Sequence, residues 1–278
     1  MHYLIYMITV IESLLQVQSV QNPEIENYLA TLPDTIQISV KAETLDGKLI
    51  FEKNSEKRLP SASIIKVPIL IELLTQAERG KIDWNEVYVL KANDKVGGAG
   101  NIQHQKNGTT FTIQELALEM IKASDNTATN IIIRKVGMEN VNHFLKLNKL
   151  ENTSLQRKMM DFEAIKNGRQ NYTSAADMNR IYQLLLKRQF LSEEWTSECL
   201  KILEECEDES TIPSMLPQNL KIAHKTGTLD YVRGDASIIY TNSNDIILSI
   251  FVEGFSSMHQ AEKIIGTLAK LIYNSNES

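Results

Sequence analysis

Three short motifs contain the side chains of this chain that could carry out nucleophilic chemistry. They are Ser63-Ile-Ile-Lys66, Ser124-Asp-Asn126 and Lys225-Thr-Gly227. In a helix, Lys66 would lie one turn beyond Ser63 on the same face, within reach of the serine hydroxyl. A lysine amine becomes a base near neutral pH when it is desolvated or placed near another cation, and Lys225 could be that cation. The first motif therefore predicts a serine nucleophile with a lysine base at a helix start.

The second and third motifs supply groups that a substrate would need. Ser124 could relay a proton to a departing amine, and Asn126 could hold a substrate amide. Lys225 and Thr226 offer a positive charge and a hydroxyl, which suit a carboxylate, and Gly227 would let substrate approach the strand edge. Each motif alone could be an ordinary helix cap, turn or strand end. However, the tripeptide Ser-Asp-Asn is expected by chance only about 0.03 times in such a chain.

Other chemical signatures are missing from the sequence. There is no Cys-x-x-Cys, no His-Glu-x-x-His and no Gly-x-Ser-x-Gly, and the five histidines are scattered. Gly97-Gly-Ala-Gly100 resembles half of a dinucleotide fingerprint, but it lacks the third glycine, and we interpret it as a flexible loop. Cys199 and Cys206 would lie about 10 Å apart on one helix face, too far for a disulfide. We expect no metal, no cofactor and two buried thiols.

Hydrophobic periodicity predicts the elements that must position the three motifs. Helices are expected at a segment ending near Ala30 and at residues 64–76, 112–123, 126–136, 175–186, 195–207 and 257–273. Strands are expected at residues 35–42, 48–52, 220–225, 236–240 and 246–252, and residues 94–108 are expected to form a loop. Strands at both ends with helices between them predict an α/β sandwich whose antiparallel sheet is flanked by terminal helices. We expect a sheet domain of residues 1–58 and 209–278, an inserted all-helical domain of residues 59–208, and an active site in the cleft between them.

Composition narrows the class of protein further. The 278 residues are 42% hydrophobic and 23% charged, and the net charge is −6. These values exclude a collagen, a mostly disordered chain and a disulfide scaffold, and a protein that coats nucleic acid would carry a basic excess. The apolar run of residues 4–11 is too short to span a bilayer. Because the first lysine or arginine of the chain is Lys41, we prefer an amphipathic helix there to a signal peptide.

The chain resembles the class A β-lactamases and their penicillin-recognising relatives. The resemblance rests on residues 60–67, 121–130 and 224–228, which contain the three motifs. It implies a β-lactamase/transpeptidase-like fold, no cofactor, an extracytoplasmic (periplasmic or secreted) monomer, and a β-lactam or D-Ala-D-Ala peptide as ligand. By this resemblance, Ser63 is the acylated nucleophile, Lys66 is its general base and Ser124 is the proton relay. Asn126 binds the acylamide side chain of the substrate, and Lys225 with Thr226 binds the substrate carboxylate. The backbone N–H groups of Ser63 and Thr228 form the oxyanion hole.

One departure from the class A pattern concerns the loop that follows the Ser-Asp-Asn helix. Class A enzymes carry Glu-x-x-Leu-Asn there, and that glutamate activates the deacylating water, whereas here its position falls on Met159 or Met160. The nearest carboxylates are Asp161 and Glu163, which are either substitute bases in a refolded loop or exposed loop charges. We expect an acyl-serine hydrolase of the class A type. The alternatives are a D-Ala-D-Ala carboxypeptidase or transpeptidase and a non-catalytic peptidoglycan-binding module.

Overall fold

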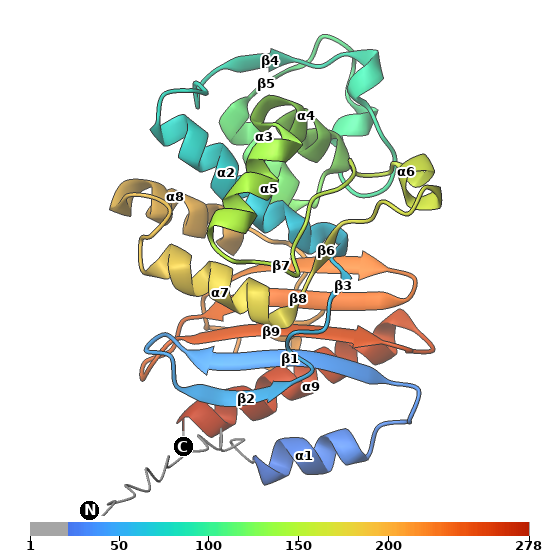
Figure 1. Ribbon diagram of the computed structural model, residues 1–278, viewed down its shortest axis with the longest axis vertical. Helices are drawn as coiled ribbons and strands as arrows, with labels where there is room; N and C mark the ends of the chain where they lie inside the picture. The colour runs from blue at the N-terminus through green and yellow to red at the C-terminus, as the bar shows by residue number, and fades with distance from the viewer. Residues whose placement is uncertain (1–21, 278) are drawn as a thin grey trace, which may run out of the picture.

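The computed structural model describes residues 22–277 and contains one five-stranded antiparallel sheet (Figure 1). Its strands are β1 (Gln37–Thr44), β2 (Leu49–Lys53), β7 (Ile222–Leu229), β8 (Val232–Ile239) and β9 (Ile246–Glu253). They lie in the order β2-β1-β9-β8-β7, so segments from both ends of the chain pair in the middle of the sheet. β7, which carries Lys225-Thr-Gly227, is an edge strand. The expected helix over residues 4–11 lies outside the described residues.

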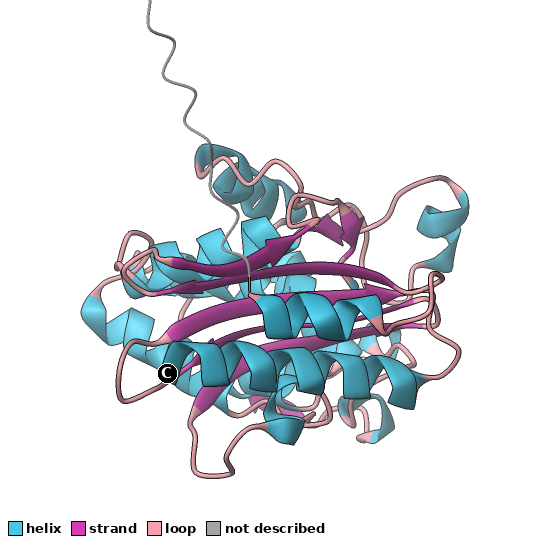
Figure 2. Ribbon diagram, turned by 90° about the horizontal axis from the view of Figure 1, so that it is seen from below, coloured by secondary structure: helices cyan, strands magenta, loops and turns pink. Residues whose placement is uncertain are grey.

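Helices cover both faces of this sheet. α9 (Met258–Glu277) runs along one face together with α1 (Pro23–Ala30), as Figure 2 shows, and α7 (Ala175–Leu186) packs on the other. The side chains of β9 alternate between the faces, as the pleat of a strand requires. Leu248 and Ile250 pack with the α9 layer, while Ile247 and Phe251 pack with the helical layer above. Because each fully buried leucine, isoleucine or phenylalanine contributes about 1.5–3 kcal/mol, this alternation fixes the register of the sheet.

Five helices form a bundle beyond α7: α2 (Lys66–Glu78), α3 (Ile113–Lys122), α4 (Asn126–Val136), α5 (Met138–Leu147) and α8 (Glu193–Glu204). The short helix α6 (Phe162–Lys166) lies to the side of this bundle (Figure 1). α2 is at the centre, because it contacts α3, α4, α5 and α8, and 11 of its 13 residues are buried. A helix that is apolar on all sides belongs in a core. The segment that carries Ser63 and Lys66 is therefore anchored in the buried centre of the helical bundle.

The structure confirms the predicted fold class, and the expected helices at 126–136 and 175–186 have the bounds observed. The predicted helix at 195–207 is displaced, because α8 spans Glu193–Glu204 and Cys206 follows it. The sequence reading missed α5 and two small antiparallel pairs, β3 (Leu59–Pro60) with β6 (Tyr172–Thr173) and β4 (Val87–Val89) with β5 (Thr110–Thr112). Within residues 22–277, no helix is both long and apolar enough to cross a bilayer.

Candidate active site

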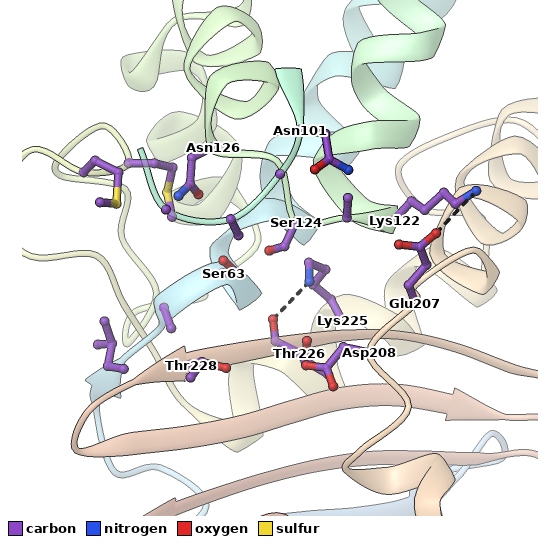
Figure 3. Close-up of a pocket in the computed structure, with 18 of the residues that line it drawn as sticks. Ser63, Asn101, Lys122, Ser124, Asn126, Glu207, Asp208, Lys225, Thr226 and Thr228 are labelled. Atoms are coloured by element: carbon purple, nitrogen blue, oxygen red, sulfur yellow. Dashed lines mark hydrogen bonds and ion pairs between the residues drawn. The ribbon is translucent and has the colours of Figure 1, made fainter. Parts of the chain in front are cut away.

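A cavity of about 580 Å³ opens where the edge strand β7 meets the helical bundle. Its size suits a small-molecule ligand. Six residues of the three motifs and their flanks line it together, from three distant segments of the chain (Figure 3): Ser63, Ser124, Asn126, Lys225, Thr226 and Thr228. The fold therefore brings the three motifs together in space, although they are far apart in the sequence.

Ser63 lies in a short 3₁₀ turn, η1 (Ala62–Ile65), that leads directly into α2. The turn begins with Ala62 at φ +46°, a conformation that non-glycine residues rarely adopt. Backbone strain of this kind is found where the surrounding structure holds a functional group in place. Here Ser61 N, bonded to Asn171 O at 2.9 Å, fixes the start of the turn. Ser63 is half-buried and faces the cavity.

Lys66 is fully buried and connects the first motif with the second. Its Nζ donates to Ser124 O at 2.6 Å, to Ser124 Oγ at 2.9 Å and to Asn126 Oδ1 at 3.2 Å. Burial lowers the pKa of Lys66 well below its usual range, and the nearby charge of Lys225 lowers it further, while Asp125 opposes the shift. Two requirements of a neutral lysine base, desolvation and a cationic neighbour, are therefore both met.

The start of α4 holds Ser124 and Asn126 in position. Ser124 has φ +54°, and Asp125 caps the helix, since its Oδ1 accepts from Ala128 N at 2.8 Å. The second oxygen of Asp125 accepts from Ile102 N at 2.8 Å, which ties the helix to the glycine-containing loop. A Cβ at Gly100 would lie 2.1 Å from Asp125 Oδ2. The glycine thus allows a close approach to α4, and this loop is packed rather than free.

On β7, Lys225 is buried and donates to Thr226 O at 3.2 Å. Burial lowers its pKa, and the charges of Cys206, Asp235 and Asp208 act in the opposite direction. Figure 3 shows Lys225 and Thr226 at the sheet side of the cavity, opposite Ser124. A buried ammonium beside a hydroxyl is suited to an anionic group of a ligand.

Gly227 packs against the turn that carries Ser63. A Cβ there would lie 3.0 Å from both Ile64 Cγ1 and Ser61 O. The missing side chain therefore makes room for the η1 turn, and the expected approach of substrate to Gly227 stays a prediction. Through this contact the strand that carries Lys225 is packed against the turn that carries Ser63.

The loop after α5 places methionines, and no carboxylate of its own, at the cavity wall. Met159 N donates to Asn130 Oδ1 at 2.8 Å, and Asn130 Nδ2 donates to Met159 O at 3.0 Å. Met159 and Met160 both line the cavity. Asp161 instead caps α6, accepting from Ala164 N at 2.9 Å, and Glu163 is exposed, and neither lines the cavity. Both candidate bases therefore lie outside the set of residues that lines the cavity with Ser63.

The sequence reading missed Arg233, which lies on β8 and is only 2% exposed. Its Nη1 donates to Thr228 Oγ1 at 2.7 Å, and its Nη2 donates to Asp208 Oδ2 and Ser210 Oγ, both at 2.8 Å. Burial would raise the pKa of the Asp208 carboxyl, but Ser210 and Arg233 outweigh it and hold that pKa well below its usual range. A second charged pair, Lys122 with Glu207 at 3.5 Å, lines the same end of the cavity as Asp208.

Comparisons with known proteins agree with this geometry. The sequence model of the β-lactamase enzyme family matches residues 22–275. The β-lactamase VEB-1 of Pseudomonas aeruginosa is 26% identical over 90% of this chain and 88% of its own length. A β-lactamase structure from Sphaerobacter thermophilus superposes with a TM-score of 0.85 at 26% identity, covering 91% of this chain and 96% of its own.

A second group of similar structures bears a different name. The structure of PBP-A has a TM-score of 0.83 at 25% identity, covering 91% of this chain and 94% of its own. A PBP-A variant, solved as an acyl-enzyme complex with penicillin G, matches equally well. Because the family match extends over almost all of the described residues and over every motif of the cavity, the chain belongs to the β-lactamase enzyme family.

Proposed function

We propose that this protein is a serine hydrolase that opens β-lactam rings through an ester on Ser63. The observation that carries the proposal is the shared cavity in which Ser63 and Lys225 face Ser124, which is itself bonded to the buried Lys66 amine. The neutral amine of Lys66 would accept the proton of Ser63 as the hydroxyl attacks the lactam carbonyl. Ser124 would then pass a proton to the ring nitrogen that departs.

Binding would use the two sides of the cavity. The substrate carboxylate would lie at Lys225 and Thr226, and its amide side chain at Asn126. The outer edge of β7 could pair with an extended substrate, as an added strand pairs with an exposed sheet edge. We assign the oxyanion hole to the N–H groups of Ser63 and Thr228, since both residues line the cavity.

Hydrolysis of the acyl-enzyme is expected to be slow. The wall facing the ester is made of Met159 and Met160, and a thioether accepts protons poorly. Loss of a positioned base typically lowers a rate by about 10²–10⁴-fold. The same observation favours a second candidate function, a D-Ala-D-Ala carboxypeptidase or transpeptidase, in which a β-lactam remains bound as an inhibitor. A non-catalytic peptidoglycan-binding module is disfavoured, because such a module has no use for a buried lysine beside two serines.

The test is a time course of nitrocefin hydrolysis together with intact-protein mass spectrometry. We expect a burst of one equivalent followed by slow turnover, and an adduct that is absent from the Ser63→Ala variant. Turnover without a burst would contradict slow deacylation, and an adduct on Ser63→Ala would remove Ser63 from its role. If Asp161 or Glu163 supplies the base, Asp161→Asn or Glu163→Gln would slow the second phase and spare the burst.

Two further proposals rest on the family resemblance. We propose that the protein acts outside the cytoplasm, in the periplasm or as a secreted protein, where peptidoglycan and β-lactams are encountered, and that it acts as a monomer. Fractionation of cells and light scattering of the purified chain test these two statements separately.

A further inference from the structure

The two ends of the active-site cavity differ in chemical character. One end is charged and polar, since Lys122, Glu207 and Asp208 lie there, as Figure 3 shows with the yellow sulfur atoms at the opposite end. The methionine end continues into α6, and Phe162 and Ile165 of that helix also line the cavity. These two residues are three apart and so lie on one helix face.

The apolar side chains at this end are unusually exposed. Phe162 is 59% exposed and Ile165 is 36% exposed, although both are large and apolar. Tyr231, in the turn after β7, is 53% exposed. It belongs to this end of the cavity, because its hydroxyl and Asp161 both lie close enough to Arg157 to influence the pKa of that residue, and Arg157 lines this end. Exposed apolar side chains that border a binding site indicate that the ligand covers them.

We propose that α6 forms an apolar lip, made by Phe162 and Ile165, that selects β-lactams with an aromatic or similarly apolar acyl side chain. The proposal rests on the function proposed above, because the ring must lie at Ser63 for its side chain to reach α6. With the carboxylate at Lys225 and the amide at Asn126, the acyl substituent points away from the charged end and toward the methionines. Phe162 and Ile165 are then specificity residues and take no part in bond breaking.

Arg157 offers a competing interpretation of the same end. It is 6% exposed, its Nε donates to Gln170 Oε1 at 2.8 Å, and its Nη1 donates to Lys158 O at 3.0 Å. Both hydrogen-bond partners are neutral, and the charge of nearby Asp161 compensates the guanidinium without a hydrogen bond to it, so Arg157 could still attract an anionic side chain. The apolar side chains nevertheless form the rim that a substituent meets first, whereas Arg157 is buried beneath it. The two alternatives predict opposite effects of a carboxylate on the acyl group.

The experiment measures second-order acylation constants for three penicillins with the same nucleus. Benzylpenicillin carries an aromatic acyl group, 6-aminopenicillanic acid carries none, and carbenicillin adds a carboxylate to the aromatic group. We expect the wild type to prefer benzylpenicillin to the other two. Phe162→Ser and Ile165→Ser should each lower the preference for benzylpenicillin over 6-aminopenicillanic acid, by about tenfold for Phe162, and leave the constant for 6-aminopenicillanic acid unchanged.

Leu147→Ser is the matched control, because Leu147 is 68% exposed at the end of α5 and does not line this cavity. It should leave all three constants unchanged. Three results would each overturn the apolar lip. The α6 variants could lose the same factor in the acylation constant for all three penicillins, or they could keep the wild-type preference for benzylpenicillin over 6-aminopenicillanic acid. The wild type could also be acylated faster by carbenicillin than by benzylpenicillin. A wild type that none of the three acylates would contradict the proposed function itself, which distinguishes the two failures.

Discussion

Lys66 is a buried amine whose hydrogen-bond partners are all uncharged. Its pKa is lowered, first by burial and then by Lys225, so its neutral form is present at lower pH than for a free lysine. We therefore expect the acylation rate at saturating substrate to rise with pH as Lys66 loses its proton. Lys225→Met removes the repelling charge, so it should raise the pKa of Lys66 and move the rising limb to higher pH.

The pH profile of nitrocefin acylation, measured by stopped flow for both proteins, tests this expectation. Weaker binding by Lys225→Met changes the concentration needed for saturation and leaves the direction of the pH shift unaffected. A limb that stays in place, or that moves to lower pH, would show that Lys66 does not titrate as the base.

Met159 is the residue at which a missing carboxylate could be restored. Its backbone N–H and C=O are both bonded to Asn130, so the loop conformation does not depend on the methionine side chain. We expect Met159→Glu to accelerate the slow phase after the acylation burst, within the ~10²–10⁴-fold that a positioned base supplies. Burial should also raise the pKa of the new carboxyl, which makes it a better base near neutral pH.

Steady-state nitrocefin turnover is the measurement for this variant. Lys158→Gln is the control, since Lys158 is exposed and adjacent, and the loss of its positive charge changes the net charge by the same −1 at a side chain that does not line the cavity. Equal acceleration by both variants would assign the effect to charge alone. An unchanged slow phase in Met159→Glu would mean that the absence of a base does not limit deacylation.

Among the elements, α4 depends on a single buried carboxylate for its start. Asp125 is 1% exposed and accepts from Ala128 N and Ile102 N, one with each oxygen. Asp125→Ala leaves two buried N–H groups without an acceptor, so we expect a loss of about 2–3 kcal/mol in the free energy of unfolding. Because Ser124 precedes this cap, acylation should slow as well.

Urea unfolding of Asp125→Ala and Asp161→Ala makes the comparison, since Asp161 caps α6 in the same manner. The latter helix has five residues and lies at the surface, so its cap should contribute about 1 kcal/mol or less. If the two variants lose the same free energy of unfolding, the burial of Asp125 and its bond to Ile102 N add nothing to the contribution of an ordinary helix cap.

Much of this arrangement of elements could be predicted from local sequence patterns. The bounds of α4 and α7 follow from capping residues, Asp125 and Ser174, combined with helical periodicity. α5 was missed because it begins directly after Gly137, the residue that ends α4, and a glycine between two helical patterns is easily taken as the end of only one. The short pairs β3–β6 and β4–β5 have two or three residues in each strand, too few to show a period of two.

The sequence could indicate those residues of the candidate site whose role depends on their type and motif. It could not indicate those whose role depends on how the chain packs. Ser63, Lys66, Ser124 and Lys225 are recognisable because their motifs are rare in combination. Arg233 gave no such signal, since its importance comes from strand pairing, which sets it opposite Thr228. The role of Asp161 as a helix cap depends equally on α6, which the sequence did not predict.

At the scale of the whole molecule, the cavity exists because the sheet and the bundle meet through the η1 turn. Ile64 of this turn lies against two glycines of the sheet, Gly227 on β7 and Gly234 on β8. A Cβ at either position would come within 3.1 Å of Ile64. Ser63 and Lys225 are thus brought together because the Ile64 side chain packs on a part of the sheet that lacks side chains. The exact division of the chain at residues 58 and 208 stays a prediction.

Behind the cavity, a buried ion pair joins β7 to β8. His224 Nδ1 lies 3.1 Å from both oxygens of Asp235, and the same carboxylate accepts from Thr211 Oγ1 at 2.7 Å. Burial alone would lower the pKa of His224, but Asp235 outweighs it, with a contribution from Cys206, and raises that pKa from 6.5 to about 10. Since the pKa is higher in the folded protein, the pair stabilises the fold fully below about pH 6.5 and loses this contribution as pH rises through about 10.

We expect His224→Gln to reveal this dependence, because glutamine can still donate to Asp235 but carries no charge. The difference in unfolding free energy between wild type and variant should be largest below pH 6.5 and should shrink toward pH 10. The lowered pKa values of Lys66 and Lys225 act in the opposite direction, but they are present in both proteins and largely cancel in the difference. The pKa of Cys206 does not cancel, because His224 helps to lower it, so both proteins are compared in a Cys206→Ser background. Urea unfolding at pH 6, 8 and about 10 measures it, with His259→Gln, at an exposed helical position, as the control. A difference that grows with pH would mean that His224 is neutral in the folded protein and that Asp235 is balanced by another cation, of which Lys225 is the nearest candidate on the same strand.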